Sequence, residues 1–370
     1  MYMLRQRILS TADLVDDSTF RFKLPSVGKF TAIQMTVNAD RYADGADNDT
    51  CYPLESCIDK IELVAGGSKT LLSLTGKQLD AMNYWAFGKP TPRRHRNRAN
   101  MDNMLNLYLL GGRNLYDQEY GWDLGKLPET YLEYTYDLSE GVAEYFKADT
   151  HDLKLYIWRW MGPGSPDFKG YFRSRQLAAW ATTGASVIKT VGLPVGNPYR
   201  WVGVQAKTRG QTIGGTITEM ELKVNNGEYS PVHIPSPMDF VMQEVAEYSL
   251  DNIISGMEYC VQDTIYDMPT YFSYYDSIDV TAYQHDPEDF WLYSMIGLPP
   301  RVEESGTSNM EYTFTQRGWG FQKCLRIGFD HLLDGADLLH TRGMGALDLD
   351  LTEQTSGEDA AVFAQDIVTY

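Results

Sequence analysis

The chain has 370 residues and a formal net charge of −18, and 43% of its residues are hydrophobic. This length suits two ordinary cores better than one, and the hydrophobic fraction is too high for a disordered chain. The acidic excess argues against general nucleic-acid binding, because neutralising phosphates requires an excess of Lys and Arg. We expect neither a signal peptide nor a membrane-spanning helix, because residues 1–9 lack an apolar stretch and no window approaches 18 uninterrupted apolar residues.

Period-two alternation predicts β-strands in both halves of the chain. Every second residue is Leu, Ile, Met or Val at 105–109, 153–157, 220–224 and 347–351. This pattern places one face of a strand on a core and the other toward water or a partner. Asn225, Asn226 and Gly227 follow one such strand as a hairpin signal, and Gly66 and Gly67 stand at the matching place earlier in the chain.

The sequence also resembles itself in four places that occur in the same order. The matched segments are 24–35 with 193–204, 58–63 with 217–222, 79–80 with 238–239, and 132–136 with 347–351. The first pair is 169 residues apart and the second is 159 apart, so the first copy carries about ten additional residues near 40–50. Matches in the same order, three of them separated by 159 to 169 residues, predict two copies of one structural unit.

A short helix is predicted in each copy. Thr75 and Gln78 have the spacing of a capping box, and Gly88 marks the expected helix end. In the second copy Ser236 precedes Pro237, which is a favourable pair for a helix start. We therefore predict an all-β fold of two tandem eight-stranded jelly rolls, each with a short helix after the fourth strand.

The breaker-rich stretch 161–166 marks the predicted junction between the copies. The predicted domains are a first jelly roll at 1–161, a connector or first strand at 162–185, and a second jelly roll at 186–370. Because the repeat covers both halves, no single domain is singled out as the carrier of a site.

These features together resemble the double jelly-roll major capsid proteins of icosahedral viruses, especially tailless bacterial viruses with an internal membrane. The resemblance covers nearly the whole chain and rests on the order and duplication of weak motifs, at 5–8, 24–25, 58–66, 74–79, 112–120 and 193–199. It implies a non-enzymatic subunit that forms homotrimers with six jelly rolls and assembles pseudo-hexagonal capsomers into a virion shell. The implied partners are neighbouring capsomers, minor capsid or vertex proteins and an underlying lipid membrane. The implied location is the virion, after synthesis in the host cytoplasm.

The only concentrated basic segment contains Arg93, Arg94, Arg96 and Arg98. We interpret it as a candidate interface with an acidic edge of a neighbouring subunit, or as a solvated loop. Contact with lipid headgroups or nucleic acid is a third reading, ranked below both.

Candidate metal ligands are weak. Asp44, Asp47 and Asp49 faintly resemble a calcium loop, but the glycine comes too early, so an exposed insertion is the alternative. His331 and His340 near several Asp residues suggest a solvated loop more than a metal site. No cofactor is predicted.

The four cysteines do not form a disulfide framework, although Cys51 and Cys57 lie close enough for one local disulfide. Free thiols in a protein made in the cytoplasm are the alternative.

Two further functions use the same predicted fold, namely a carbohydrate-binding lectin or spike and a glycan-cleaving hydrolase. Paired aromatics such as Trp158 and Trp160 could form a sugar platform, but in jelly rolls they are more often core or interface residues. No Asp or Glu pair is singled out as catalytic.

Overall fold

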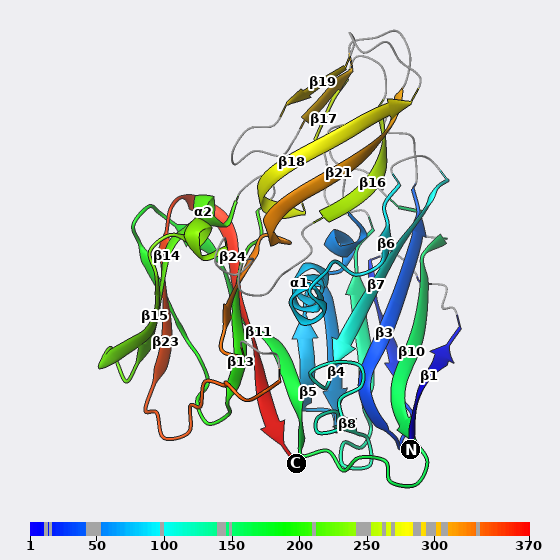
Figure 1. Ribbon diagram of the computed structural model, residues 1–370, viewed down its shortest axis with the longest axis vertical. Helices are drawn as coiled ribbons and strands as arrows, with labels where there is room; N and C mark the ends of the chain where they lie inside the picture. Colours follow the sequence, from blue (N-terminus) through cyan, green and yellow to red (C-terminus); the bar gives the residue numbers. More distant parts are fainter. Residues whose placement is uncertain are drawn as a thin grey trace.

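The computed structural model describes most of the chain. The described residues are 1–10, 14, 17–41, 53–96, 100–138, 146–147, 150–208, 212–241, 253–260, 264–267, 271–283, 290–293, 301–304, 310–330 and 334–370. The elements form two β-sandwiches side by side and a separate group of strands that projects from one end (Figure 1).

The first jelly roll consists of two antiparallel sheets built from residues before 162. One sheet has the order β1 (Tyr2–Leu9), β10 (Asp152–Met161), β3 (Lys29–Asp40), β7 (Asp102–Leu110) and β6 (Arg93–Arg94), and β8 (Trp122–Asp123) pairs with β3. The other begins with β2 (Ser18–Lys23), β9 (Tyr131–Tyr136), β4 (Lys60–Ala65) and β5 (Lys69–Leu74). The short 3-10 helix η1 (Leu54–Cys57) precedes β4.

The second jelly roll repeats this order of strands. One sheet contains β11 (Gly170–Thr183), β24 (Ser356–Thr369), β13 (Tyr199–Ala206) and β22 (Cys324–Gly328). The other contains β12 (Ile188–Gly192), β23 (Leu347–Glu353), β14 (Ile217–Val224) and β15 (Tyr229–Ile234). The short helix α2 (Ile213–Thr216) precedes β14. The predicted double jelly roll is therefore confirmed.

Helix α1 (Gly76–Phe87) has the predicted ends. The Thr75 hydroxyl accepts from the Gln78 backbone N–H while the Gln78 side chain accepts from the Thr75 N–H, and Gly88 closes the helix with φ 71°. Residues 237–241 are helical in the second roll, as predicted from Ser236 and Pro237. Each helix follows the fifth strand rather than the predicted fourth, because β1 and β11 each add a first strand to their rolls.

The projecting strands belong to the segment between the second helix and β22 (Figure 1). They form two three-stranded sheets. One has the order β16 (Ile253–Cys260), β21 (Met310–Phe321) and β18 (Phe272–Tyr283), and the other β17 (Thr264–Asp267), β20 (Arg301–Glu304) and β19 (Phe290–Tyr293).

The predicted alternation corresponds to buried core positions. The apolar residues at 105–109, 153–157, 220–224 and 347–351 are at most 1% exposed. Positive φ values at Asn225, Asn226 and Gly227 form the predicted turn between β14 and β15, as Gly66 and Gly67 do between β4 and β5.

The two rolls are joined through one continuous sheet. Parallel pairing of Ser174 with Leu72, and of Arg175 with Ser73, connects β11 of the second roll to β5 of the first. Strand β11 lies inside the predicted connector 162–185. Because one sheet crosses this region, the sheets supply no independent boundary, and the predicted domain limits stay a prediction.

Candidate assembly surfaces and the junction between the jelly rolls

Helix α1 covers the outer face of the second roll's β11-β24-β13 sheet with an aromatic cluster. The Trp85 ring lies 5.7 Å from Phe363 in a stacked arrangement and 6.0 Å from Trp201 in an edge-to-face arrangement. All three side chains are at most 1% exposed. Such aromatic contacts add to the free energy gained from burying the rings, so this face is a dry junction.

Polar contacts fix α1 in register on the same sheet. The Gln78 amide donates to the Gln176 side chain at 2.8 Å and to the Gln205 side chain at 3.2 Å. Its carboxamide oxygen caps Thr75 at the helix start. One side chain therefore closes the helix terminus and binds strands β11 and β13.

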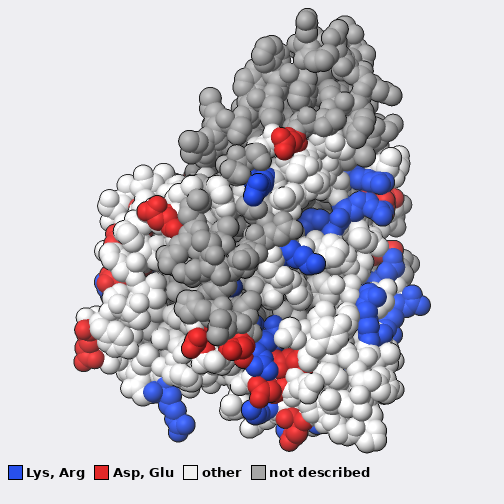
Figure 2. Space-filling model, viewed as in Figure 1, with Lys and Arg blue, Asp and Glu red and all other residues white. Residues whose placement is uncertain are grey.

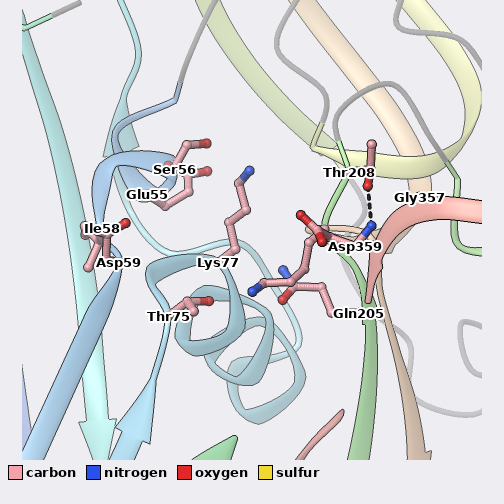
Figure 3. A pocket seen from close by; sticks show the side chains of 11 residues that line it. Glu55, Ser56, Ile58, Asp59, Thr75, Lys77, Gln205, Thr208, Gly357 and Asp359 are labelled. Atoms are coloured by element: carbon pink, nitrogen blue, oxygen red, sulfur yellow. Dashed lines mark hydrogen bonds between the residues drawn. The ribbon is translucent and has the colours of Figure 1, made fainter. Parts of the chain in front are cut away.

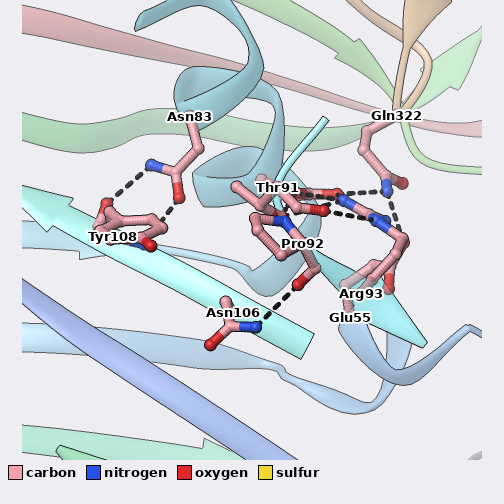
Figure 4. A network of polar contacts seen from close by, with 9 residues as sticks. Glu55, Asn83, Thr91, Pro92, Arg93, Asn106, Tyr108 and Gln322 are labelled. Carbon is pink, nitrogen blue, oxygen red and sulfur yellow. Dashed lines mark hydrogen bonds and ion pairs between the residues drawn. The ribbon is translucent and has the colours of Figure 1, made fainter. Parts of the chain in front are cut away.

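A buried ion cluster lies at the other side of α1 (Figure 4). The Arg93 guanidinium donates to Glu55 at 2.9 Å and to both oxygens of Asp80 at 2.7 Å. The Gln322 amide donates to the same two carboxylates. Burial by itself lowers the pKa of Arg93, but the Asp80 and Glu55 carboxylates outweigh this effect and raise the pKa above its ordinary value. Because Gln322 lies in the turn between β21 and β22, the cluster ties the first roll to the point where the projecting strands return to the second roll.

The structure corrects the interface prediction for Arg93. Its side chain is 7% exposed and points inward, because the side chains of adjacent residues on strand β6 point to opposite faces of the sheet. Arg94 points outward, with 44% of its side chain exposed, and pairs with Asp102. Arg96 is 37% exposed and lies 3.9 Å from the same Asp102. Arg98 lies outside the described residues.

The outer face of the β1-β10-β3-β7-β6 sheet carries an excess of positive charge, and we call it the basic face. Its cations are Arg5, Arg7, Arg94, Arg96 and Lys154, and its carboxylates are Asp40, Asp102 and Asp152. Arg5 lies over the Tyr156 ring at 4.0 Å and donates to Gln34 at 3.0 Å. Figure 2 shows Lys and Arg side chains on the right-hand edge, where Figure 1 places β1 and β10.

The outer face of the β12-β23-β14-β15 sheet has the opposite charge, and we call it the acidic face. Its acidic residues are Glu219, Glu221, Asp348 and Asp350, and Lys223 and His233 lie among them. Lys223 binds Asp350 at 2.7 Å and Glu221 at 3.1 Å, and these hydrogen bonds raise the pKa of Lys223. Acidic side chains lie along the left-hand edge of Figure 2, where Figure 1 places this sheet.

A polar cavity of 450 Å³ opens between η1, the start of α1 and the ends of β13 and β24 (Figure 3). Lys77 points into it, across from Asp359 on β24. Burial, and then Asp137 and Asp17, raise the pKa of Asp59 in its wall. Both carboxylates and ammonium groups line the cavity, and such a polar lining is suited to binding ordered water where the two rolls meet.

The predicted metal and disulfide sites each include residues that the structure does not describe. Asp44, Asp47, Asp49, Cys51 and His331 lie outside the described residues, so the calcium loop, the disulfide and the His331–His340 site stay predictions. Within the described ranges, no cluster of three His, Cys, Asp or Glu side chains could hold a metal ion. No described helix is long and apolar enough to cross a membrane.

The sequence alone did not reveal the partners of Arg93. Glu55, Asp80 and Gln322 carry no shared motif, and Gln322 is 242 residues from Asp80. The available signal was a charged residue, Asp80, in a short predicted helix that is otherwise rich in apolar and aromatic residues, because a buried charge requires a partner.

Comparison with solved structures supports the same architecture over the whole chain. The crystal structure of the STIV MCP, from Sulfolobus Turreted Icosahedral Virus, aligns with a TM-score of 0.63 at 12% identity, covering 100% of this chain and 97% of that chain. The major capsid protein of bacteriophage PM2 gives 0.55 at 9% identity, covering 100% and 98%. The fold is that of double jelly-roll capsid proteins.

A third likeness has the same extent. The PBCV-1 virus capsid gives a TM-score of 0.54 at 9% identity, covering 99% of this chain and 93% of that chain. No protein-family model matches the sequence, and a search of curated proteins finds no match. At identities of 9–12%, these likenesses establish the fold alone.

Proposed function

We propose that this chain is the major capsid protein of an icosahedral virus, a structural and non-enzymatic subunit that forms homotrimeric, pseudo-hexagonal capsomers. The observation that carries this proposal is the alignment of both jelly rolls, end to end, with capsid proteins of three viruses. An alignment of one roll alone would fit many binding proteins and enzymes, because jelly rolls host many functions.

The duplicated fold supports a trimer in particular. Each chain places two similar sandwiches side by side, so three chains in a ring would present six similar units. Such a ring approximates a hexagon and tiles a shell with few kinds of contact, because closed symmetry reuses one interface.

The proposal includes the setting implied by the sequence resemblance. The trimers would contact neighbouring capsomers, minor capsid or vertex proteins and an underlying membrane, in the virion of a tailless bacterial virus. The likeness to the bacteriophage PM2 protein supports the bacterial virus in this proposal. The subunit would be made in the host cytoplasm before assembly.

Electron microscopy of the purified full chain, combined with its mass in solution, tests the proposal. We expect a mass of three chains and hexagonal outlines, and ordered arrays or closed particles at high protein concentration. A chain that stays monomeric at every concentration, ionic strength and pH tested would contradict the proposal. Binding of a glycan array by that monomer would favour the lectin alternative.

A further inference from the structure

We propose that β15 and the helix beginning at Pro237 in one copy cover β1 and the basic face of the next copy. The contact between chains would then repeat the junction that β5 and α1 make with β11 and its sheet inside each chain. This inference rests on the proposed trimer and identifies the surfaces that form it.

The edges of the sheets lead to this proposal. Strands β5 and β11 are equivalent to β15 and β1, respectively, by their places in the two rolls. The first two pair with each other, whereas β15 and β1 end their sheets among the described strands. A sheet edge offers a row of backbone donors and acceptors to another strand, so the second junction is complete only when another copy supplies it.

Strand register gives the expected neighbours. Ala32 and Trp201 are equivalent in the sequence repeat, and cross-strand pairing leads from Ala32 to Arg5 and from Trp201 to Ser174. By the same count Arg7 is equivalent to Gln176. Each of these two residues is followed by a register shift in its strand pairing, which supports the match.

The partner strand follows in the same way. Leu63 pairs with Leu72, and its equivalent Leu222 pairs with Val232. Because Leu72 pairs with Ser174 within the chain, Val232 of one copy is expected beside Arg5 of the next.

The helix supplies the second contact. Counted from the helix starts at Gly76 and Pro237, the third residues are Gln78, which binds Gln176, and Asp239. This structural alignment replaces the sequence match of 79–80 with 238–239, which is shifted by two residues. The position equivalent to Gln176 is Arg7, which is exposed, as is Asp239. The amide pair inside the chain would thus become an ion pair between Asp239 and Arg7.

Charge distribution supports a contact between different surfaces of two copies. The basic face and the acidic face lie at opposite sides of the molecule (Figures 1 and 2). Identical basic faces would repel each other, whereas head-to-tail contact brings Asp239 to the basic face and can close into a ring. In this register Leu222 and Val232 lie on the face that meets Arg5, and Glu221 lies on the opposite face, so the opposite charges that meet are Asp239 and Arg7.

A charge swap in the full chain tests the predicted ion pair. Arg7→Asp and Asp239→Arg should each weaken trimer formation by about tenfold or more, measured by mass photometry across a dilution series at low salt. The chain carrying both changes should regain trimers, because every interface again pairs opposite charges. Arg21→Asp, at an exposed residue of β2, is a matched control that should leave association unchanged.

Cysteine cross-linking tests the strand pairing independently of charge. The chain with Arg5→Cys and Val232→Cys should form covalent trimers under mild oxidation, whereas the chain with Arg21→Cys and Val232→Cys should stay uncross-linked. Near-ultraviolet circular dichroism of each variant would establish that it is folded.

The outcomes separate this inference from the proposed function. Wild-type trimers that neither respond to the charge swap nor cross-link through Arg5→Cys and Val232→Cys would overturn the inference and leave the capsid proposal standing. A wild-type chain that never associates would overturn both. Rescue in the double swap, together with the specific cross-link, would establish the contact.

Discussion

The outer faces of two equivalent sheets differ in chemistry because only one of them is covered within the chain. In the second roll, α1 lies on Trp201 and Phe363, and both side chains are buried. In the first roll the position of Phe363 is taken by half-buried Tyr156, with Arg5 above its ring. The same pattern of strands thus supports a dry junction in one roll and a basic, aromatic surface in the other.

This difference indicates how a duplicated unit can remain soluble before it assembles. An uncovered copy of the Trp201–Phe363 face would be a contiguous apolar patch, which favours uncontrolled association. On the basic face, guanidinium groups lie over aromatic rings. Before assembly they expose charge to water, and the rings beneath them remain available for contact with a partner. Orientation is then chosen by charge complementarity.

Removing the aromatic centre of the covered junction should have the largest effect on stability. Trp85→Ala is expected to cost about 3–5 kcal/mol, because it empties a buried space between Trp201 and Phe363. Denaturant unfolding of the dissociated subunit measures this cost. Tyr156→Ala, at the equivalent uncovered face, should cost much less in the subunit and should weaken the trimer instead. Equal losses of subunit stability would contradict the contrast between the faces.

Neighbouring arginines on β6 offer a second contrast. Arg93→Met should destabilise the subunit by about 3 kcal/mol, the lower end of the range for breaking a buried ion pair, because Gln322 still donates to both remaining carboxylates. Arg94→Met, on the exposed face, should change stability by less than about 0.5 kcal/mol. Thermal or denaturant unfolding of both variants checks the prediction, and a neutral Arg93→Met would show that the cluster is not required.

The elements that sequence predicted well depend on neighbouring residues. Thr75 and Gly88 set the ends of α1, and the turn at 225–227 requires positive φ values that Asn and Gly tolerate. The basic segment was predicted less well, because its residues 93 and 94 form the short strand β6. The alternation of that strand points the Arg93 side chain inward and the Arg94 side chain outward. Its partner Gln322 comes from a distant part of the chain, so only the assembled fold brings the two together.

Acid should destabilise the chain through the buried His151 of the first roll. Burial lowers the pKa of His151 to about 4, and the ring lies among Tyr134 and Tyr136 with its Nε2 3.1 Å from the Tyr134 hydroxyl. The unfolded chain takes up this proton near pH 6.5, so the folded state loses stability as the pH falls from 6.5 toward 4. The loss should approach about 3 kcal/mol at pH 4.

His151→Gln should flatten that part of the pH profile, measured by denaturant unfolding between pH 7 and pH 4. The variant begins with a cost at neutral pH, because it disturbs a buried contact with Tyr134. The slope is therefore the informative quantity. Parallel profiles for the variant and the wild type would assign the acid sensitivity to other groups.

The smallest expected effect concerns the start of α1, where the covering of the second roll begins. Thr75→Ala should cost about 1 kcal/mol, because the Gln78 backbone N–H loses its acceptor. Thr75→Ser keeps a hydroxyl and should restore most of this stability. Since Gln78 also binds Gln176 and Gln205, loosening the cap should raise hydrogen exchange in α1 before it raises exchange in β13. Equal increases in both elements would mean that helix and sheet open as one unit, and the covered face would then be part of the core rather than a junction.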